Sequence, residues 1–209
     1  MKKIVILDYD SGNLHSVAKA ITQVADNKTQ ILISDKHEHI KNADRIIFPG
    51  QGAAADCMRK LKEHNLIDEI NYAIKNKPFL GICMGMQVLF QKSSENNGTD
   101  LLNIYQGEVK DFKKHIKKDF KIPHMGWNNV KQMTEHPLWN NIKDNSSFYF
   151  VHSYFASPQQ KNIITGTSLY DIDFCSVIAC ENVFACQFHP EKSTNDGLQL
   201  LKNFINWQI

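Results

Sequence analysis

Residues 78–90, Pro-Phe-Leu-Gly-Ile-Cys-Met-Gly-Met-Gln-Val-Leu-Phe, predict a buried strand that turns sharply into a helix. The short apolar run before Cys83 is typical of a strand in a parallel sheet, and the apolar residues after it suit a helix. Gly81 and Gly85 stand two positions on either side of the cysteine, where larger side chains would collide in so sharp a turn. The G-x-S-x-G turn surrounds its exposed serine with the same spacing. The stretch therefore predicts an α/β fold that presents Cys83 as a nucleophile.

The rest of the first half alternates strand and helix patterns, which implies right-handed crossovers and a parallel sheet. Strands are expected at 3–7, 31–33 and 45–48, and helices at 14–25, 56–62 and 67–75. The second half holds short β-rich runs at 148–154, 163–168, 177–180 and 183–188, followed by a closing helix at 197–207. We therefore expect a single domain over residues 1–209, with a mixed, mainly parallel open sheet flanked by helices and extended by antiparallel strands.

Composition excludes several other classes. A net charge of +2 on 209 residues gives no nucleic-acid footprint, and no apolar stretch is long enough to cross a bilayer. The five cysteines are odd in number and form no C-x-x-C pair, which favours reduced thiols in a cytoplasmic protein over disulfides or a zinc site. No metal or cofactor is indicated. The lysine-rich segment 110–121 is interpreted as a solvated excursion and not as a specific anion site.

A lone cysteine is more often a small buried apolar residue than a nucleophile, so Cys83 needs a partner. About a hundred residues later, an apolar run ends at His189, and Pro190 and Glu191 follow. A histidine at a strand end can be purely structural. A carboxylate two positions on can turn back and fix the tautomer of the imidazole, which is the arrangement that an activated cysteine requires.

With these residues in place, the chain resembles the class I, or triad-type, glutamine amidotransferases over its whole length. It is more narrowly similar to the glutaminase subunits that make ammonia for a separate cyclase barrel in histidine biosynthesis. The segments that carry the closer match are Asp8–Leu14, Pro49–Gly52, Gly85–Gln87 and Pro123–Asn128. The resemblance implies a flavodoxin-like core, with Cys83 as nucleophile, His189 as general base and then acid, and Glu191 as the residue that orients it.

The same resemblance suggests the rest of the site. The amide of Met84, the residue after the nucleophile, should face the tetrahedral oxygen. Gln51 is the expected second oxyanion donor, with Gly52 beside the substrate, although 49–52 also reads as an ordinary turn. Valine is frequent at position 51 in the family, but only the backbone amide is invoked. Gln87 and Glu95 would bind the polar head of glutamine, unless Glu95 is simply a loop acid facing water.

Coupling to a partner is also implied, because free ammonia is protonated in water and ceases to be a nucleophile. The resemblance implies a heterodimer with a (β/α)8-barrel cyclase. Asn13, Trp127 and Lys192 are the candidate contacts, although Trp127 could be a core residue and Lys192 a rim charge. Two alternatives stay open: a paralogue that feeds another acceptor, as in surface-sugar synthesis, and a subunit that has kept the fold without the chemistry.

Overall fold

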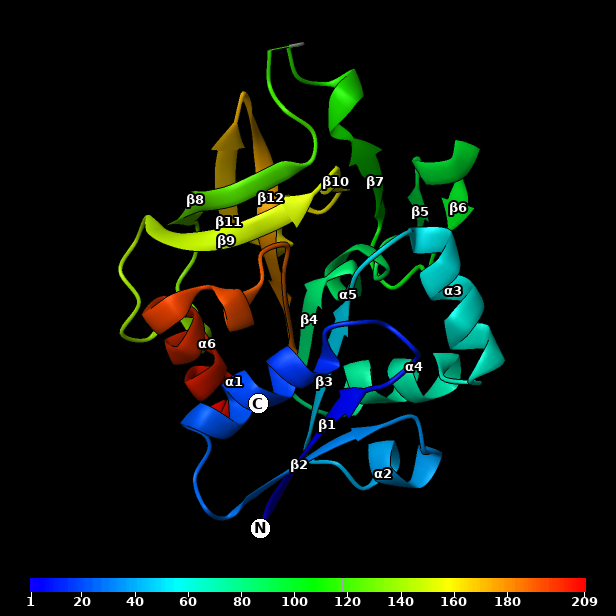
Figure 1. Cartoon of the computed structure of the whole chain (residues 1–209), viewed down its shortest axis with the longest axis vertical. Helices are drawn as coiled ribbons and strands as arrows, with labels where there is room; N and C mark the ends of the chain where they lie inside the picture. Colours follow the sequence, from blue (N-terminus) through cyan, green and yellow to red (C-terminus); the bar gives the residue numbers. More distant parts are fainter. Residues whose placement is uncertain (118) are drawn as a thin grey trace.

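The fold is an α/β sandwich, seen in a computed structural model that describes residues 1–117 and 119–209 (Figure 1). The strands are β1 Lys2–Leu7, β2 Thr29–Ser34, β3 Arg45–Gly50, β4 Phe79–Cys83, β5 Lys92–Ser93, β6 Thr99–Asp100, β7 Gly107–Asp111, β8 His124–Gln132, β9 Ser146–His152, β10 Tyr154–Pro158, β11 Ile164–Tyr170, β12 Ile172–Cys180 and β13 Val183–Cys186. The α-helices are α1 Leu14–Val24, α2 His37–Lys41, α3 Ala54–Glu63, α4 Ile67–Asn76, α5 Met84–Gln87 and α6 Thr194–Asn206. No helix in this described part of the chain is long and apolar enough to cross a bilayer.

The core of the sheet is parallel, as the sequence predicts. Its strands lie in the order β2-β1-β3-β4-β13, and every neighbouring pair among them is parallel. This is the doubly wound order in which ligands bind at the carboxyl ends of the strands. Register places Gly50, the last residue of β3, beside Cys83, the last residue of β4. The reactive edge of the sheet is thereby built from two neighbouring strand ends.

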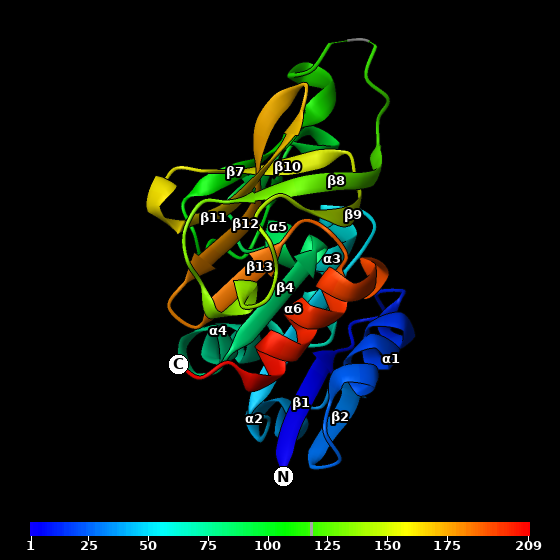
Figure 2. The same cartoon turned by 90° about the vertical axis from the view of Figure 1, so that its left-hand side faces the viewer.

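Alternation along β1 explains the two layers of helices. Val5 and Leu7 join the buried cluster that α3 and α4 cover, whereas Ile4 and Ile6 join the cluster on the other face, under α1 and α6. Successive side chains of a strand point to opposite faces, so a strand covered on both sides must be apolar throughout. Figure 2 shows α1 and α6 together on one face of the parallel strands.

Antiparallel strands extend the sheet beyond β13, as expected for the second half. β12 pairs antiparallel with β13, and β10, β7, β5 and β6 follow in order. β11 pairs with both β12 and β8, and β8 pairs with β9. In Figure 1 these strands form the upper part of the molecule, above the carboxyl edge of the parallel core.

Three details differ from the sequence-based expectations. The helix after Cys83 is only one turn long, because α5 ends at Gln87. β8 is unexpected, because its sequence does not alternate polar and apolar residues. The apolar Met125 and Trp127 occupy exposed positions of this strand. In the lysine-rich segment 110–121, of which residue 118 lies outside the described residues, Phe112 is fully buried among aromatic rings. Residues 113–115, 117 and 119–121 are exposed, as the solvated interpretation requires, so Phe112 is the exception that anchors the segment in the core.

Candidate active site

Cys83 occupies a strained turn at the carboxyl end of β4. Its backbone has φ 55° and ψ −105°, in a region that residues with side chains rarely adopt. The adjoining glycines make the turn possible: a Cβ on Gly85 would lie 1.8 Å from the carbonyl oxygen of Phe48, and one on Gly81 would lie 2.7 Å from that of Gly85. Strain held in place by such close packing is typical of a functional position. The predicted turn around Cys83 is thus present in the structure.

His189 and Glu191 form a buried pair just beyond β13. His189 Nδ1 lies 2.8 Å from Glu191 Oε1, and Asn13 Nδ2 donates to the same oxygen at 2.8 Å. A proton on Nδ1 leaves Nε2 as the acceptor, and Nε2 has no hydrogen-bond partner among residues 1–117 and 119–209. The pair therefore holds the imidazole in the tautomer that can accept a proton.

The charge interaction with Cys83 changes the pKa of the His189 imidazole. Burial alone lowers the pKa of His189, but the neighbouring Cys83 and the hydrogen-bonded Glu191 outweigh it and raise the pKa to about 10. An imidazolium beside the sulfur favours the thiolate, which is the nucleophilic form of cysteine. The structure thus brings the three candidate triad residues into one electrostatic unit, across more than a hundred positions of sequence.

A pocket of about 300 Å³ opens over this unit. Its lining includes Cys83 and His189 and also the five residues that the sequence suggests for oxyanion and substrate binding, namely Gln51, Gly52, Met84, Gln87 and Glu95. A volume of this order suits a small amino-acid ligand. The geometry thus brings all seven residues to a single pocket. Their individual roles in binding stay predictions.

The loop after β3 approaches the pocket through unusual backbone. Gly52 has φ +90°, a conformation that favours glycine. The side chain of Gln51 packs against Gly12, since a Cβ on that glycine would lie 2.2 Å from Gln51 Nε2. The side chain at position 51 therefore contacts the turn after β1, although Gln51 as a whole is exposed.

Gln87 and Glu95 are both held by neighbouring backbone. Gln87 Nε2 donates to the carbonyl oxygen of Tyr154 at 3.0 Å and to Gln187 Oε1 at 2.8 Å. Glu95 Oε2 accepts a hydrogen bond from the amide of Ala54 at 2.7 Å, at the start of α3. Glu95 is therefore an ordered lining residue, which argues against a loop acid that merely faces water.

The structure adds pocket residues that the sequence reasoning did not assign. The segment 151–154, which the sequence suggests only as part of a β-rich run, lines the pocket together with Pro123. Gln187 is fully buried and donates toward Cys83 Sγ at 3.6 Å. The only sequence signal is a single glutamine inside the apolar-rich run 183–188, which does not reveal a contact with Cys83.

The three candidate partner contacts lie near the pocket but differ in exposure. Trp127 is 52% exposed, so it is not a core residue, and its ring packs edge-on against Tyr149 with centroids 6.1 Å apart. Lys192 is exposed, with its Nζ 5.9 Å from the centroid of the same Tyr149 ring. Asn13 is half-buried and points inward to Glu191. Trp127, Tyr149 and Lys192 thus form a surface cluster, whereas Asn13 belongs with the triad.

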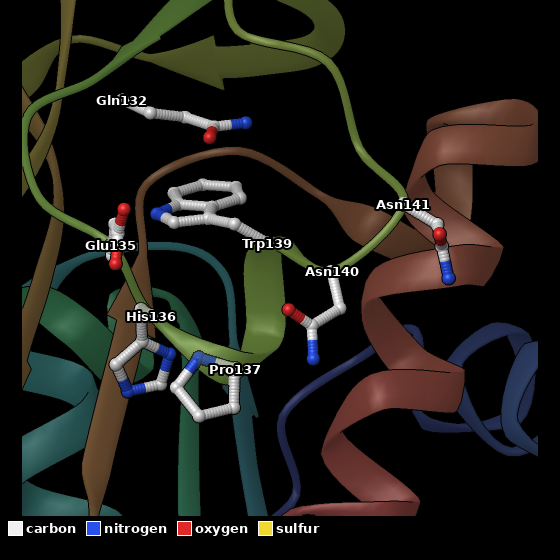
Figure 3. A pocket seen from close by; sticks show the side chains of 7 residues that line it. All are labelled: Gln132, Glu135, His136, Pro137, Trp139, Asn140 and Asn141. Atoms are coloured by element: carbon white, nitrogen blue, oxygen red, sulfur yellow. The ribbon is translucent and has the colours of Figure 1, made fainter.

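A separate hollow of about 540 Å³ lies between the end of β8 and the short helix Pro137–Trp139 (Figure 3). It shares no lining residue with the pocket over Cys83. Burial lowers the pKa of His136 there to about 4, and its Nδ1 accepts a hydrogen bond from the amide of Leu138 at 3.1 Å. His136 therefore acts as a helix cap and not as a reactive group.

Comparison with known proteins points to one family. The family model "Glutamine amidotransferase class-I" matches residues 5–207. The chain is 54% identical to imidazole glycerol phosphate synthase subunit HisH of Hydrogenovibrio crunogenus, over 99% of this chain and 97% of that one. It is 47% identical to the subunit of the same name from Acinetobacter baylyi, over the full length of both.

Solved structures agree on the fold. The structure titled PurLQS from Thermotoga maritima superposes with a TM-score of 0.74 at 16% identity and covers 98% of both chains. A glutamine amidotransferase crystal structure superposes with a TM-score of 0.71 at 15% identity, over 97% of both chains. At these identities the likeness concerns the fold alone. The match of the family model and the identity to the two relatives decide the family: the chain belongs to the class-I glutamine amidotransferases, and within them to the family of imidazole glycerol phosphate synthase subunit HisH.

Proposed function

We propose that this chain hydrolyses L-glutamine to glutamate and ammonia through a thioester on Cys83. The ammonia passes to a cyclase subunit, which makes imidazole glycerol phosphate and AICAR in L-histidine biosynthesis. The observation that carries the proposal is the pairing of a strained, pocket-lining Cys83 with the His189–Glu191 pair. The name shared by the relatives supports the choice of pathway.

The chemistry follows from the geometry. His189 Nε2 takes the proton of Cys83, and the thiolate attacks the side-chain amide carbon of glutamine. Negative charge builds on the carbonyl oxygen, for which the amides of Met84 and Gln51 are the proposed donors. His189 then returns the proton to the leaving nitrogen, ammonia departs, and a glutamyl thioester remains. Water, deprotonated by His189, attacks the thioester and releases glutamate and the thiol.

The exposed face of β8 that carries Met125 and Trp127 is the proposed docking face for the cyclase barrel. Met125 and Trp127 are 61% and 52% exposed on β8, a few residues from Pro123, which lines the pocket. Large exposed apolar side chains next to a reaction site are favoured anchors at interfaces. A partner seated there would cover the pocket mouth and receive ammonia before water protonates it. We place the reaction in the cytoplasm, where the five reduced cysteines would persist.

The test is to mix the purified chain with its candidate cyclase and to measure glutamate release with and without the nucleotide-derived cyclase ligand. We expect low release from the chain alone and strong stimulation in the liganded complex. Cys83→Ala should abolish product formation from glutamine in that complex while synthesis from added ammonium salts continues. If synthesis from ammonium vanished too, the division of labour between the subunits would be wrong.

A further inference from the structure

One buried polar side chain beside the triad has no part in the mechanism above. Gln187 is fully buried in the segment that joins β13 to His189. Burying an amide is unfavourable unless its hydrogen bonds are satisfied. Both ends of this amide have partners: Oε1 lies 2.8 Å from Gln87 Nε2, and Nε2 lies 3.6 Å from Cys83 Sγ.

A backbone carbonyl fixes which way these amides point. The oxygen of Tyr154 can only accept, so the Gln87 amide must turn its Nε2 toward it. The second hydrogen of the same nitrogen then goes to Gln187, which must present Oε1. Gln187 Nε2 is therefore the atom that faces the sulfur of Cys83. The orientation follows from the chain of partners and not from an arbitrary choice of amide rotamer.

We propose that Gln187 is a positioning residue for the nucleophile: it donates a hydrogen bond to Cys83 Sγ, holds the sulfur toward the pocket, and stabilises the thiolate. The proposal rests on the proposed function, in that it takes Cys83 as the nucleophile. A hydrogen bond to the charged form of a group favours that form. Because Gln87 orients Gln187, a residue of the substrate pocket and the nucleophile belong to one hydrogen-bonded chain.

The other titratable groups around the sulfur do not replace this donor. Tyr9 Oη donates to the carbonyl oxygen of Pro49 at 2.9 Å, Cys186 Sγ donates to that of Phe188 at 3.5 Å, and His152 Nδ1 lies 2.8 Å from that of Tyr154, so the proton of each is already engaged elsewhere. The carboxylate of Glu95 lies in the same pocket and cannot donate. His189 is the general base, so Gln187 supplies a neutral donor that remains in place throughout the reaction.

The test measures the rate of Cys83 alkylation by iodoacetamide against pH, by mass spectrometry of the intact chain. A Cys180→Ser background removes the cysteine that is partly exposed, so that the signal comes from the pocket-lining Cys83. Gln187→Met, of similar volume, should raise the pH midpoint for alkylation by about one unit, since one donor to the thiolate is lost. In the complex, kcat for glutamate release should fall about tenfold with little change in KM.

Gln187→Glu is the second variant, because it keeps an acceptor for Gln87 while placing an acid beside the sulfur; it should raise the midpoint at least as far. Thr165→Val, a buried polar-to-apolar change on β11, is the matched control and should leave the midpoint unchanged. A midpoint equal to that of wild type in either folded Gln187 variant overturns the proposal, as does a change confined to KM. Alkylation needs no glutamine, so a shifted midpoint together with no glutamate release from the liganded complex would refute the proposed function and leave the contact of Gln187 with Cys83 standing.

Discussion

At the residue scale, Glu191 connects two other residues of the site, His189 and Asn13, by hydrogen bonds. Its Oε1 accepts hydrogen bonds from both His189 Nδ1 and Asn13 Nδ2, while its Oε2 is buried and has no partner within the described residues. In the proposed mechanism the carboxylate orients the imidazole and stabilises its charged form, but does not itself carry the proton. Asn13 in turn fixes the carboxylate, so its side chain serves the triad before it can serve a partner.

We expect Glu191→Gln to slow glutamate release less than His189→Ala does. An amide can keep its oxygen toward Nδ1 and place its nitrogen where Oε2 now has no partner, which preserves the tautomer. Loss of the general base should reduce kcat on the order of 10³-fold. Steady-state kinetics of the complex, with circular dichroism to verify folding, measures both; equal losses in two folded variants would contradict the orienting role.

The convergence of the three candidate triad residues could be predicted from the sequence, because parallel strands bring their carboxyl ends to one edge of the sheet. Cys83 and His189 each follow such a strand, and Glu191 is tied to His189 by a short spacing. The inward turn of Asn13 and the contact of Gln187 with sulfur could not be predicted. Both depend on side-chain orientation, which packing decides and a motif does not record.

At the element scale, the turn after β4 depends on how closely α5 approaches β3. Gly85→Ala should destabilise the fold by about 2 kcal/mol or more, because the new Cβ would meet the backbone oxygen of Phe48 at 1.8 Å. Backbone in the middle of a parallel sheet cannot move aside cheaply. Urea denaturation of Gly85→Ala and wild type measures the difference, and equal free energies of unfolding would show that the contact can relax.

β8 and the short length of α5 are not predicted by the sequence, because in both places the pattern of apolar residues does not match the period of the element. β8 has only two fully buried positions, His124 and Val130, and carries exposed apolar residues where a two-layer pattern calls for polar ones. A strand that exposes apolar side chains and buries a histidine thus lacks the alternation of polar and apolar residues that identifies strands in a sequence. The one-turn length of α5 has a related origin: the apolar residues after Gln87 are buried, but in turns, and burial alone does not distinguish a turn from a helix.

At the scale of the whole molecule, the exposed face on β8 should bind the cyclase. Trp127→Ala should weaken association at least tenfold, because a large, rigid side chain at the centre of an interface carries much of its free energy. Tyr72→Ala is the control, since Tyr72 is a comparably exposed aromatic residue on α4, away from β8 in Figure 1. Titration calorimetry measures both, and equal affinities for the two variants would place the interface elsewhere.

Acid should unfold the molecule through its buried histidines. Burial lowers the pKa of His124 and His136 to about 4 and that of His152 to about 3, whereas unfolded histidine titrates near 6.5. The unfolded chain therefore binds more protons below pH 6.5, so this stability is present above that pH and is lost as pH falls toward 4. His189, with its pKa raised to about 10, is protonated in both states there and adds no slope.

His136 allows this linkage to be tested away from the triad. His136→Asn keeps an acceptor for the amide of Leu138 and removes one titrating group, so the dependence of unfolding free energy on pH near pH 5 should fall by about 1.4 kcal/mol per pH unit. Urea denaturation between pH 4.5 and 6.5 measures that slope, and His15→Asn on the exposed face of α1 is the matched control. If both variants kept the wild-type dependence of unfolding free energy on pH, the loss of stability in acid would have to come from the carboxylates. The packing of His136 against Phe184 and Trp207 would then not keep the imidazole neutral.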